Sequence, residues 1–147
     1  MLEFTAVLPV RDTELECEML TDSLASCLQL EPSEVLLCLD APSRRITQRA
    51  ERVADFFNYH GLRFLIVPPS PGWNFQLAKI VWTAYTEARN DIILSFDVDT
   101  VLFKKPLLRG FDIIRNDDRI GLVSFRKFLR TRTLPDYLRM FAYSTLY

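Results

Sequence analysis

The sequence Asp91-Ile92-Ile93-Leu94-Ser95-Phe96-Asp97-Val98-Asp99 decides the fold. Its first part is a short, nearly continuous apolar run, which predicts a buried strand of a parallel sheet. Asp97 and Asp99 follow at once, and ligands of open α/β sheets bind just beyond the carboxyl ends of strands. Side chains two residues apart share a face of a strand, so both carboxylates are expected to point the same way. Such a pair suits Mg²⁺ or Mn²⁺ shared with a phosphate. The alternative is a strand that ends in a solvated acidic turn.

Around this strand, apolar segments of strand length alternate with longer segments of helical period. The pattern predicts an α/β fold with three layers and a doubly wound, mostly parallel sheet. Thr13 and Glu16 have the spacing of a capping box, and Gly61 is expected to close the second helix. The expected strands are 4–10, 35–39, 64–67, 92–96 and 120–125, and the expected helices are 13–30, 45–59, 74–88, 106–116 and 134–147.

Composition sets limits on the class of protein. The chain has 147 residues, 49% of them hydrophobic, which is enough for one domain with a sizeable core. The 18 Lys and Arg balance 19 Asp and Glu, so no overall field attracts nucleic acid. Apolar runs fall short of the roughly 18 residues of a membrane span, and no signal-peptide pattern is present, so we expect a cytoplasmic protein.

The cysteines and the single histidine are not expected to bind a metal or to act in catalysis. Cys17, Cys27 and Cys38 lie in apolar surroundings without metal-site spacing, which predicts reduced core thiols. His60, the only histidine, precedes Gly61, so we expect it to contact a helix C-terminus rather than act in catalysis.

Polar side chains follow three of the expected strands. Arg11 and Asp12 leave the first, Asp40 leaves the second, and the two acids of 97–99 leave the fourth. In a parallel sheet these loops gather along one edge. A carboxylate such as Asp40 can accept hydrogens from a base, and Arg11 can face a diphosphate. Taken singly, Asp40 also fits an Asx turn before a proline, and Arg11 a solvated charge; together the loops predict a nucleoside-diphosphate site.

The segment from about Thr5 to Phe125 resembles the GT-A fold glycosyltransferases of the family 2 type. Residues 5–14, Thr-Ala-Val-Leu-Pro-Val-Arg-Asp-Thr-Glu, are similar to the family's opening strand, with Asp12 where Asn is usual. The resemblance implies that Pro9, Val10, Arg11 and Asp12 line the nucleotide. Residues 35–40 resemble the second strand, whose terminal acid, here Asp40, contacts the base. The usual second acid and Gly-Ser pair are replaced by Ala41-Pro42-Ser43.

Two later segments extend the resemblance. Gly72 and residues 76–79 are similar to the helix after the third strand, with Lys79 near a usual Asn and within reach of the diphosphate or sugar. Residues 91–99 resemble the metal-binding strand, which implies that Asp97 and Val98 contact the nucleotide and that Asp97 and Asp99 hold Mn²⁺ or Mg²⁺. The resemblance implies a nucleotide-sugar-binding domain at 1–125 that uses a nucleotide-diphospho-sugar donor and an unknown saccharide, lipid-linked or protein acceptor.

An inverting transferase also needs a general base. The acids after the metal strand are Asp112, Asp117, Asp118 and Asp136, and sequence singles out none of them as that base. The chain can therefore be a fragment, a minimal enzyme, or a domain completed by a missing acceptor half or a second copy.

Two other functions remain open. Residues 97–102 also resemble the first motif of haloacid dehalogenase-like phosphatases, with Asp97 as nucleophile and Asp99 as general acid-base. A non-catalytic nucleotide-sugar-binding or assembly module is the second. The basic, aromatic segment 126–147, expected to be helical, either contacts a membrane surface peripherally or packs on the rest of the protein.

Overall fold

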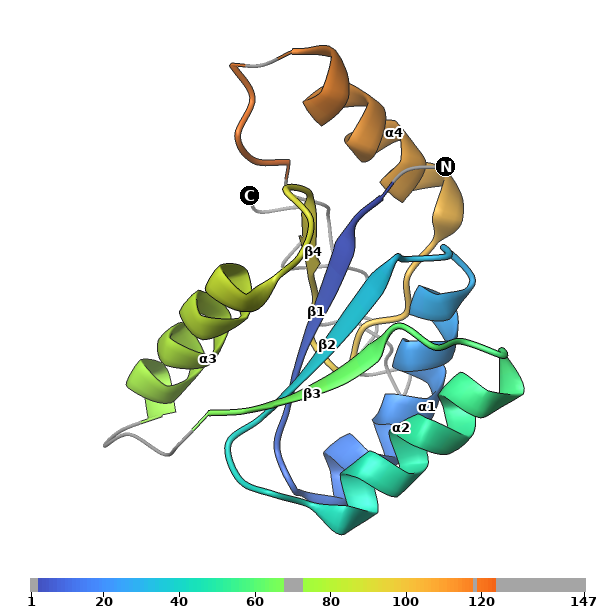
Figure 1. The fold of residues 1–147 in the computed structure, drawn as a ribbon, viewed down its shortest axis with the longest axis vertical. Coiled ribbons are helices and arrows are strands. Elements are labelled where there is room, and N and C mark those ends of the chain that lie inside the picture. Colours follow the sequence, from blue (N-terminus) through green and yellow to red (C-terminus); the bar gives the residue numbers. More distant parts are fainter. Residues whose placement is uncertain (1–2, 68–72, 118, 124–147) are drawn as a thin grey trace, which may run out of the picture.

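The computed structural model describes residues 3–67, 73–117 and 119–123. Within these residues, four strands alternate with four helices (Figure 1). They are β1 (Thr5–Val10), α1 (Glu14–Leu28), β2 (Glu34–Leu39), α2 (Arg44–Phe56), β3 (Leu62–Ile66), α3 (Trp73–Glu87), β4 (Ile93–Ser95) and α4 (Lys104–Asn116). The predicted α/β fold is confirmed.

The strands form one parallel sheet in the order β3-β2-β1-β4. The chain builds outward from β1 to β3 and then crosses back, so that β4 pairs with the other side of β1. The strand order therefore reverses between β1 and β4, and we call this position the switch point of the sheet. Open α/β sheets bind ligands at their switch point, just beyond the carboxyl ends of the strands.

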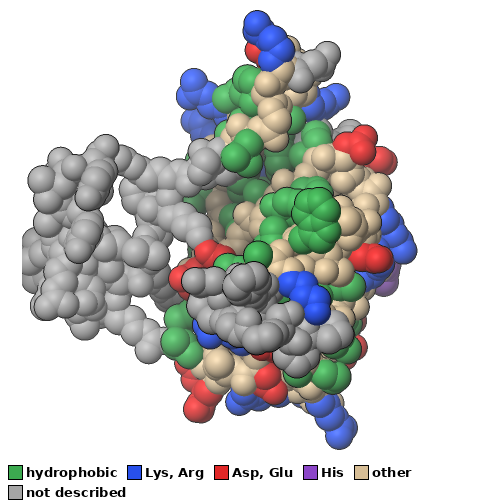
Figure 2. Space-filling view, turned by 90° about the vertical axis from the view of Figure 1, so that its left-hand side faces the viewer, with side chains coloured by type: hydrophobic (Ala, Val, Ile, Leu, Met, Phe, Trp, Pro, Cys, Tyr) green, Lys and Arg blue, Asp and Glu red, His purple; other side chains and the backbone are tan. Residues whose placement is uncertain are grey.

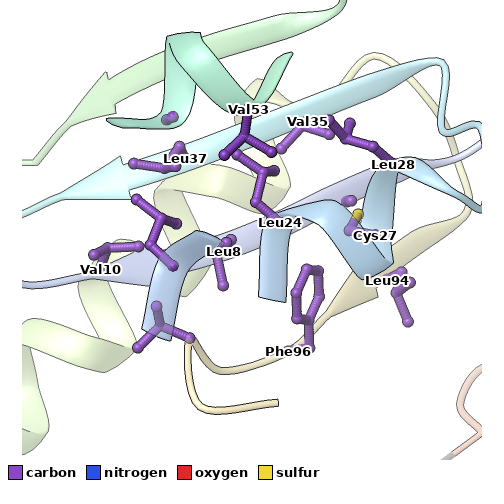
Figure 3. Packing of buried hydrophobic residues seen from close by; sticks show 14 of the residues in the cluster. Leu8, Val10, Leu24, Cys27, Leu28, Val35, Leu37, Val53, Leu94 and Phe96 are labelled. Atoms are coloured by element: carbon purple, nitrogen blue, oxygen red, sulfur yellow. The ribbon is translucent and has the colours of Figure 1, made fainter. Parts of the chain in front are cut away.

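Helices cover both faces of the sheet, α1 and α2 on one and α3 on the other (Figure 1). Alternate residues of each strand point to opposite layers, as the pleat requires. Leu8 and Val10 of β1 and Leu37 of β2 pack beneath α1 and α2, against residues such as Leu24 and Val53 (Figure 3). On the other face, Val7, Leu36 and Cys38 pack against Ile80 and Ala84 of α3. Both layers are apolar. A shift of one residue in a strand would exchange the side chains that face the two layers, so this packing fixes the register of the strands.

The ends of some elements differ from the sequence prediction. Helix α2 ends at Phe56, and Asn58 takes the left-handed conformation (φ 51°) that Gly61 was expected to supply. Gly61 is instead required by space, since a Cβ there would lie 2.7 Å from the carbonyl oxygen of Ser33. His60 is exposed and lies four residues after the end of α2, so its contact with a helix C-terminus stays a prediction.

Two further predictions concern the last third of the chain. The fifth strand, expected at 120–125, is not formed in its described part, 120–123, where Leu122 is 83% exposed. The helix expected at 134–147, and the boundary of the segment 126–147, lie outside the described residues. The three cysteines are buried and unpaired, as predicted. Burial raises the pKa of Cys27 and of Cys38 to about 12, which makes both thiols unreactive.

A buried carboxylate ties together the amino ends of the strands, at the edge opposite the switch point. Glu34 at the start of β2 accepts hydrogen bonds from the Thr5 hydroxyl (2.9 Å), the Arg89 backbone N–H (2.9 Å) and the Arg63 guanidinium. Burial raises the pKa of Glu34, but the bonds from Arg89, Arg63 and Thr5 outweigh it and hold the pKa below the ordinary value. The carboxylate therefore stays charged and joins β1, β2, β3 and the segment before β4.

Two large aromatic side chains of α3 are exposed. Trp82 is 72% exposed and Tyr85 is 45% exposed. Seen from the α3 side, the surface carries hydrophobic side chains among polar ones (Figure 2). No helix in the described part of the chain is long and apolar enough to cross a membrane.

Candidate functional site

A cavity of about 390 Å³ opens at the carboxyl ends of β1 and β4, where the strand order reverses. The loop after β2, the first turns of α1 and one side of α3 complete its wall. The residues that line it are Pro9, Val10, Arg11, Leu15, Glu16, Met19, Asp40, Leu77, Ile80, Asp97, Val98 and Asp99. Three predicted loops therefore meet in one hollow.

The acidic segment reaches the cavity because its apolar residues hold it in place. Phe96 and Val98 are buried in the layer beneath α1, whereas Asp97 and Asp99, which alternate with them, are exposed. The pairing of β4 ends at Ser95, and a turn closed by the Thr100 N–H and the Asp97 carbonyl (3.0 Å) follows. Both acids line the cavity, but they lie on this turn rather than on the strand.

The strand itself is less buried than predicted. In the described sheet β4 is an edge strand, with Ile93 half-buried and Ser95 exposed. An edge strand has a partner on one side only, so its outward residues need not be apolar. The segment after the acids is fixed to α1 instead, because the Leu102 N–H donates to the Ser26 hydroxyl (2.9 Å).

The loop between β1 and α1 is held by Glu16. Thr13 caps α1 as predicted, accepting a hydrogen bond from the Glu16 N–H (3.1 Å). The second half of the predicted capping box is wrong, because the Glu16 carboxylate binds Arg11 instead of the Thr13 N–H. Its two oxygens accept from the Arg11 backbone N–H (2.6 Å) and from Arg11 Nε (2.8 Å).

Two predicted nucleotide residues lie outside the cavity wall. Asp12 turns away and accepts two hydrogen bonds from Arg45 at the start of α2, 2.7 Å from Nη2 and 3.2 Å from Nε. Hydrogen bonds from Arg45 and Ser43 lower the pKa of Asp12, so this acid is a structural link between the first two loops. Lys79 is exposed on α3, and the neighbours Leu77 and Ile80 line the cavity in its place.

Five lining residues were missed by sequence reasoning: Leu15, Glu16, Met19, Leu77 and Ile80. Four of them are apolar residues on helices, and their periodicity fits a core-facing stripe as well as a cavity wall. Leu15 is 49% exposed, which no pattern reveals. They give the cavity apolar walls around a group of charges, the arrangement typical of small-molecule sites.

Asp97 and Asp99 are two carboxylates on one turn of the cavity wall, and carboxylates can hold a divalent cation. Hard cations such as Mg²⁺ and Mn²⁺ take oxygen ligands, and commonly share them with substrate phosphates and water. Within the described residues, no three Asp, Glu, His or Cys side chains form a complete protein-only metal site. A cation at this turn therefore needs further ligands from a bound molecule or from water.

Among the described residues, the acids that follow the 97–100 turn do not supply a general base next to it. Asp112 is exposed on α4, and Asp117 is paired with Arg119 (2.8 Å). Hydrogen bonds from Arg119 lower the pKa of Asp117, which weakens it as a base. Neither residue lines the cavity, and Asp118 and Asp136 lie outside the described residues.

Comparison with known proteins gives structural but not sequence relatives. No protein-family model and no curated protein matches the sequence. Residues 1–349 of TarS from S. aureus match with a TM-score of 0.59 and 18% identity, over 78% of this chain and 33% of that one. The mannosyltransferase PcManGT from Pyrobaculum calidifontis, in complex with GDP-Man and Mn²⁺, matches with a TM-score of 0.55 and 17% identity, over 76% of this chain and 32% of that one.

A third solved structure, TarS 1–349 in complex with UDP-GlcNAc, matches with a TM-score of 0.52 and 19% identity. This match covers 78% of this chain and 32% of that one. The chain thus spans about a third of the length of these structures. Its sheet order, its helices on both faces and these matches establish a GT-A-like fold.

Proposed function

We propose that this chain is the nucleotide-sugar-binding part of a metal-dependent glycosyltransferase, with its α/β domain at 1–125. The observation that carries the proposal is the meeting of Arg11, Asp40, Asp97 and Asp99 in one cavity at the switch point of the sheet. These residues come from three separate loops, and a fold of this class places ligands there. Structural neighbours that hold GDP-Man with Mn²⁺ and UDP-GlcNAc support the choice of ligand.

The charge of the cavity supports the need for a metal. Arg11 is the one cationic side chain among its described lining residues, against Glu16, Asp40, Asp97 and Asp99. A diphosphate brought into such surroundings meets repulsion unless another positive charge accompanies it. Asp97 and Asp99 would hold Mn²⁺ or Mg²⁺, which when bound stabilises the negative charge that develops on a departing diphosphate.

Each side chain of the chain itself then has one task. Asp40, half-buried at the end of β2, accepts hydrogen bonds from the base. The apolar side chains of α1 and α3 exclude water from the base. Arg11 donates to the diphosphate. We assign neither the acceptor site nor the general base to the described residues of this cavity.

The phosphatase alternative is less well supported. It requires Asp97 as a nucleophile on an early strand, whereas three strand-helix units precede Asp97 here. A non-catalytic binding module shares the cavity and differs only in lacking turnover.

A binding screen tests the proposal. The protein is incubated with a panel of uridine, guanosine, thymidine and cytidine diphospho-sugars, with and without Mn²⁺, and its melting temperature is recorded. We expect one donor to raise the melting temperature, and only when Mn²⁺ is present, because a ligand that binds the folded state stabilises it. Phosphatase activity without such a donor effect would favour the phosphatase reading. A donor effect without donor turnover over any acceptor would favour the binding module.

A further inference from the structure

The Glu16 carboxylate makes two contacts with one residue of the site. Oε2 accepts from the Arg11 backbone N–H at 2.6 Å, and Oε1 accepts from Arg11 Nε at 2.8 Å. The Glu16 side chain is only 13% exposed, whereas that of Arg11 is 46% exposed. A nearly buried carboxylate therefore fixes both the backbone and the side chain of an arginine that faces solvent and the cavity.

Helix capping alone does not account for this arrangement. A carboxylate at this position of a capping box normally returns to the N-cap N–H. Here the Thr13 N–H bonds to the Arg11 carbonyl instead (2.8 Å), which closes a tight turn and brings the Arg11 N–H within reach of Glu16. The turn and the carboxylate together give Arg11 one defined direction.

The side-chain hydrogen bond to Glu16 uses Nε of Arg11 and not its two terminal nitrogens. A guanidinium has five N–H donors in a planar fork, and Oε1 takes the one on Nε. The remaining four are on the two terminal nitrogens, which are the atoms that pair with phosphate oxygens in a bidentate contact. Both Arg11 and Glu16 line the cavity.

We infer that Glu16 is a positioning residue, which holds the Arg11 guanidinium in the orientation that receives the diphosphate of the donor. The inference rests on the proposed function. Glu16 itself contacts neither the base nor the phosphates; it removes the rotamer freedom that Arg11 would otherwise lose on binding. The negative charge of Glu16 is itself paired with Arg11, so the Glu16 carboxylate does not face the diphosphate as an unpaired charge.

Affinity measurements on a double-mutant cycle test the inference. The proteins are wild type, Glu16→Gln, Arg11→Ala and the double variant, each titrated at saturating Mn²⁺ with the preferred nucleoside diphosphate and with the corresponding nucleoside. Glu14→Gln is the matched control, since Glu14 is also an acid of the first turn of α1 but does not line the cavity. Melting temperatures confirm that each variant is folded.

We expect Glu16→Gln to weaken diphosphate binding about tenfold, the loss of one charge-assisted contact, and to leave nucleoside binding within about twofold. In the Arg11→Ala background the same change should have no further effect, because Glu16 acts through Arg11. Glu14→Gln should bind like wild type.

Three results would overturn the inference. They are an unchanged diphosphate affinity in Glu16→Gln, an equal loss for diphosphate and nucleoside, or the full loss persisting without Arg11. In each of these cases wild type still binds the diphosphate with Mn²⁺, so the proposed function stands. If wild type itself binds no nucleoside diphosphate, the proposed function fails, and the inference fails with it.

Discussion

At the scale of single residues, the environment separates acids that look alike in the sequence. Asp12 and Asp40 both follow strands, and both were predicted to contact the nucleotide. Asp40 lines the cavity, whereas Asp12 is held by Arg45 of the next helix. The difference depends on a partner 33 residues away, which local patterns do not contain.

Asp40→Ala tests base recognition by the cavity. We expect nucleotide affinity to fall by about 1.5 to 3 kcal/mol, the scale of a hydrogen bond to a charged group, with the metal requirement retained. Calorimetry at saturating Mn²⁺ measures this loss. Asp12→Ala is the matched control and should bind normally. Unchanged affinity and base preference in Asp40→Ala would reduce Asp40 to a turn residue.

The places of Asp97 and Asp99 could be predicted because their alternation with Phe96 and Val98 is a local pattern. Glu16 could not be placed in the same way. Its spacing from Thr13 is local, but the choice of Arg11 as its partner depends on the backbone turn at 11–13. The sequence therefore predicted which loops meet at the cavity but not the contacts within them.

At the scale of elements, the carboxyl ends and the amino ends of the strands have different roles. The carboxyl ends of the strands form the cavity, and the amino ends are joined by the buried Glu34. The helices and strands could be predicted because their apolar periods are strong. Their ends depended on individual conformations, such as that of Asn58, and β4 is limited to the three residues that pair with β1.

Glu34→Gln tests the joining of the amino ends. We expect a loss of about 2 kcal/mol in the free energy of unfolding near neutral pH, because Arg63 and Arg89 lose their buried partner. Nucleotide binding should not change, since Glu34 lies at the opposite edge. Urea denaturation measures the loss, and Glu31→Gln, an exposed acid nearby, is the control.

The effect of Glu34 should also depend on pH. The pKa of Glu34 in the folded protein lies below its ordinary value of 4.5, so the carboxylate stabilises the fold above that pH. Protonation removes this contribution as the pH falls through the folded pKa. The difference in unfolding free energy between wild type and Glu34→Gln should therefore shrink on acidification below 4.5. A difference that stays constant or grows would show that the charge of Glu34 does not stabilise the fold.

At the scale of the whole molecule, the chain contains the sheet and the cavity of a GT-A-like fold but spans about a third of its structural neighbours. The cavity collects acids from separate loops around one arginine, and its apolar walls come from α1 and α3. This balance of charge leads to the central claim, that a nucleoside diphosphate binds here only together with a divalent cation.

Calorimetric titration with nucleoside diphosphates, in Mn²⁺ and in EDTA, tests that claim most directly. Wild type should bind one of the uridine, guanosine, thymidine or cytidine diphosphates in Mn²⁺ and lose at least about tenfold in affinity in EDTA. Asp99→Asn should bind in Mn²⁺ as weakly as wild type does in EDTA, with an unchanged melting temperature, because the exposed carboxylate supports no core packing. Equal affinity with and without Mn²⁺, or no binding of any of the four, would contradict the claim.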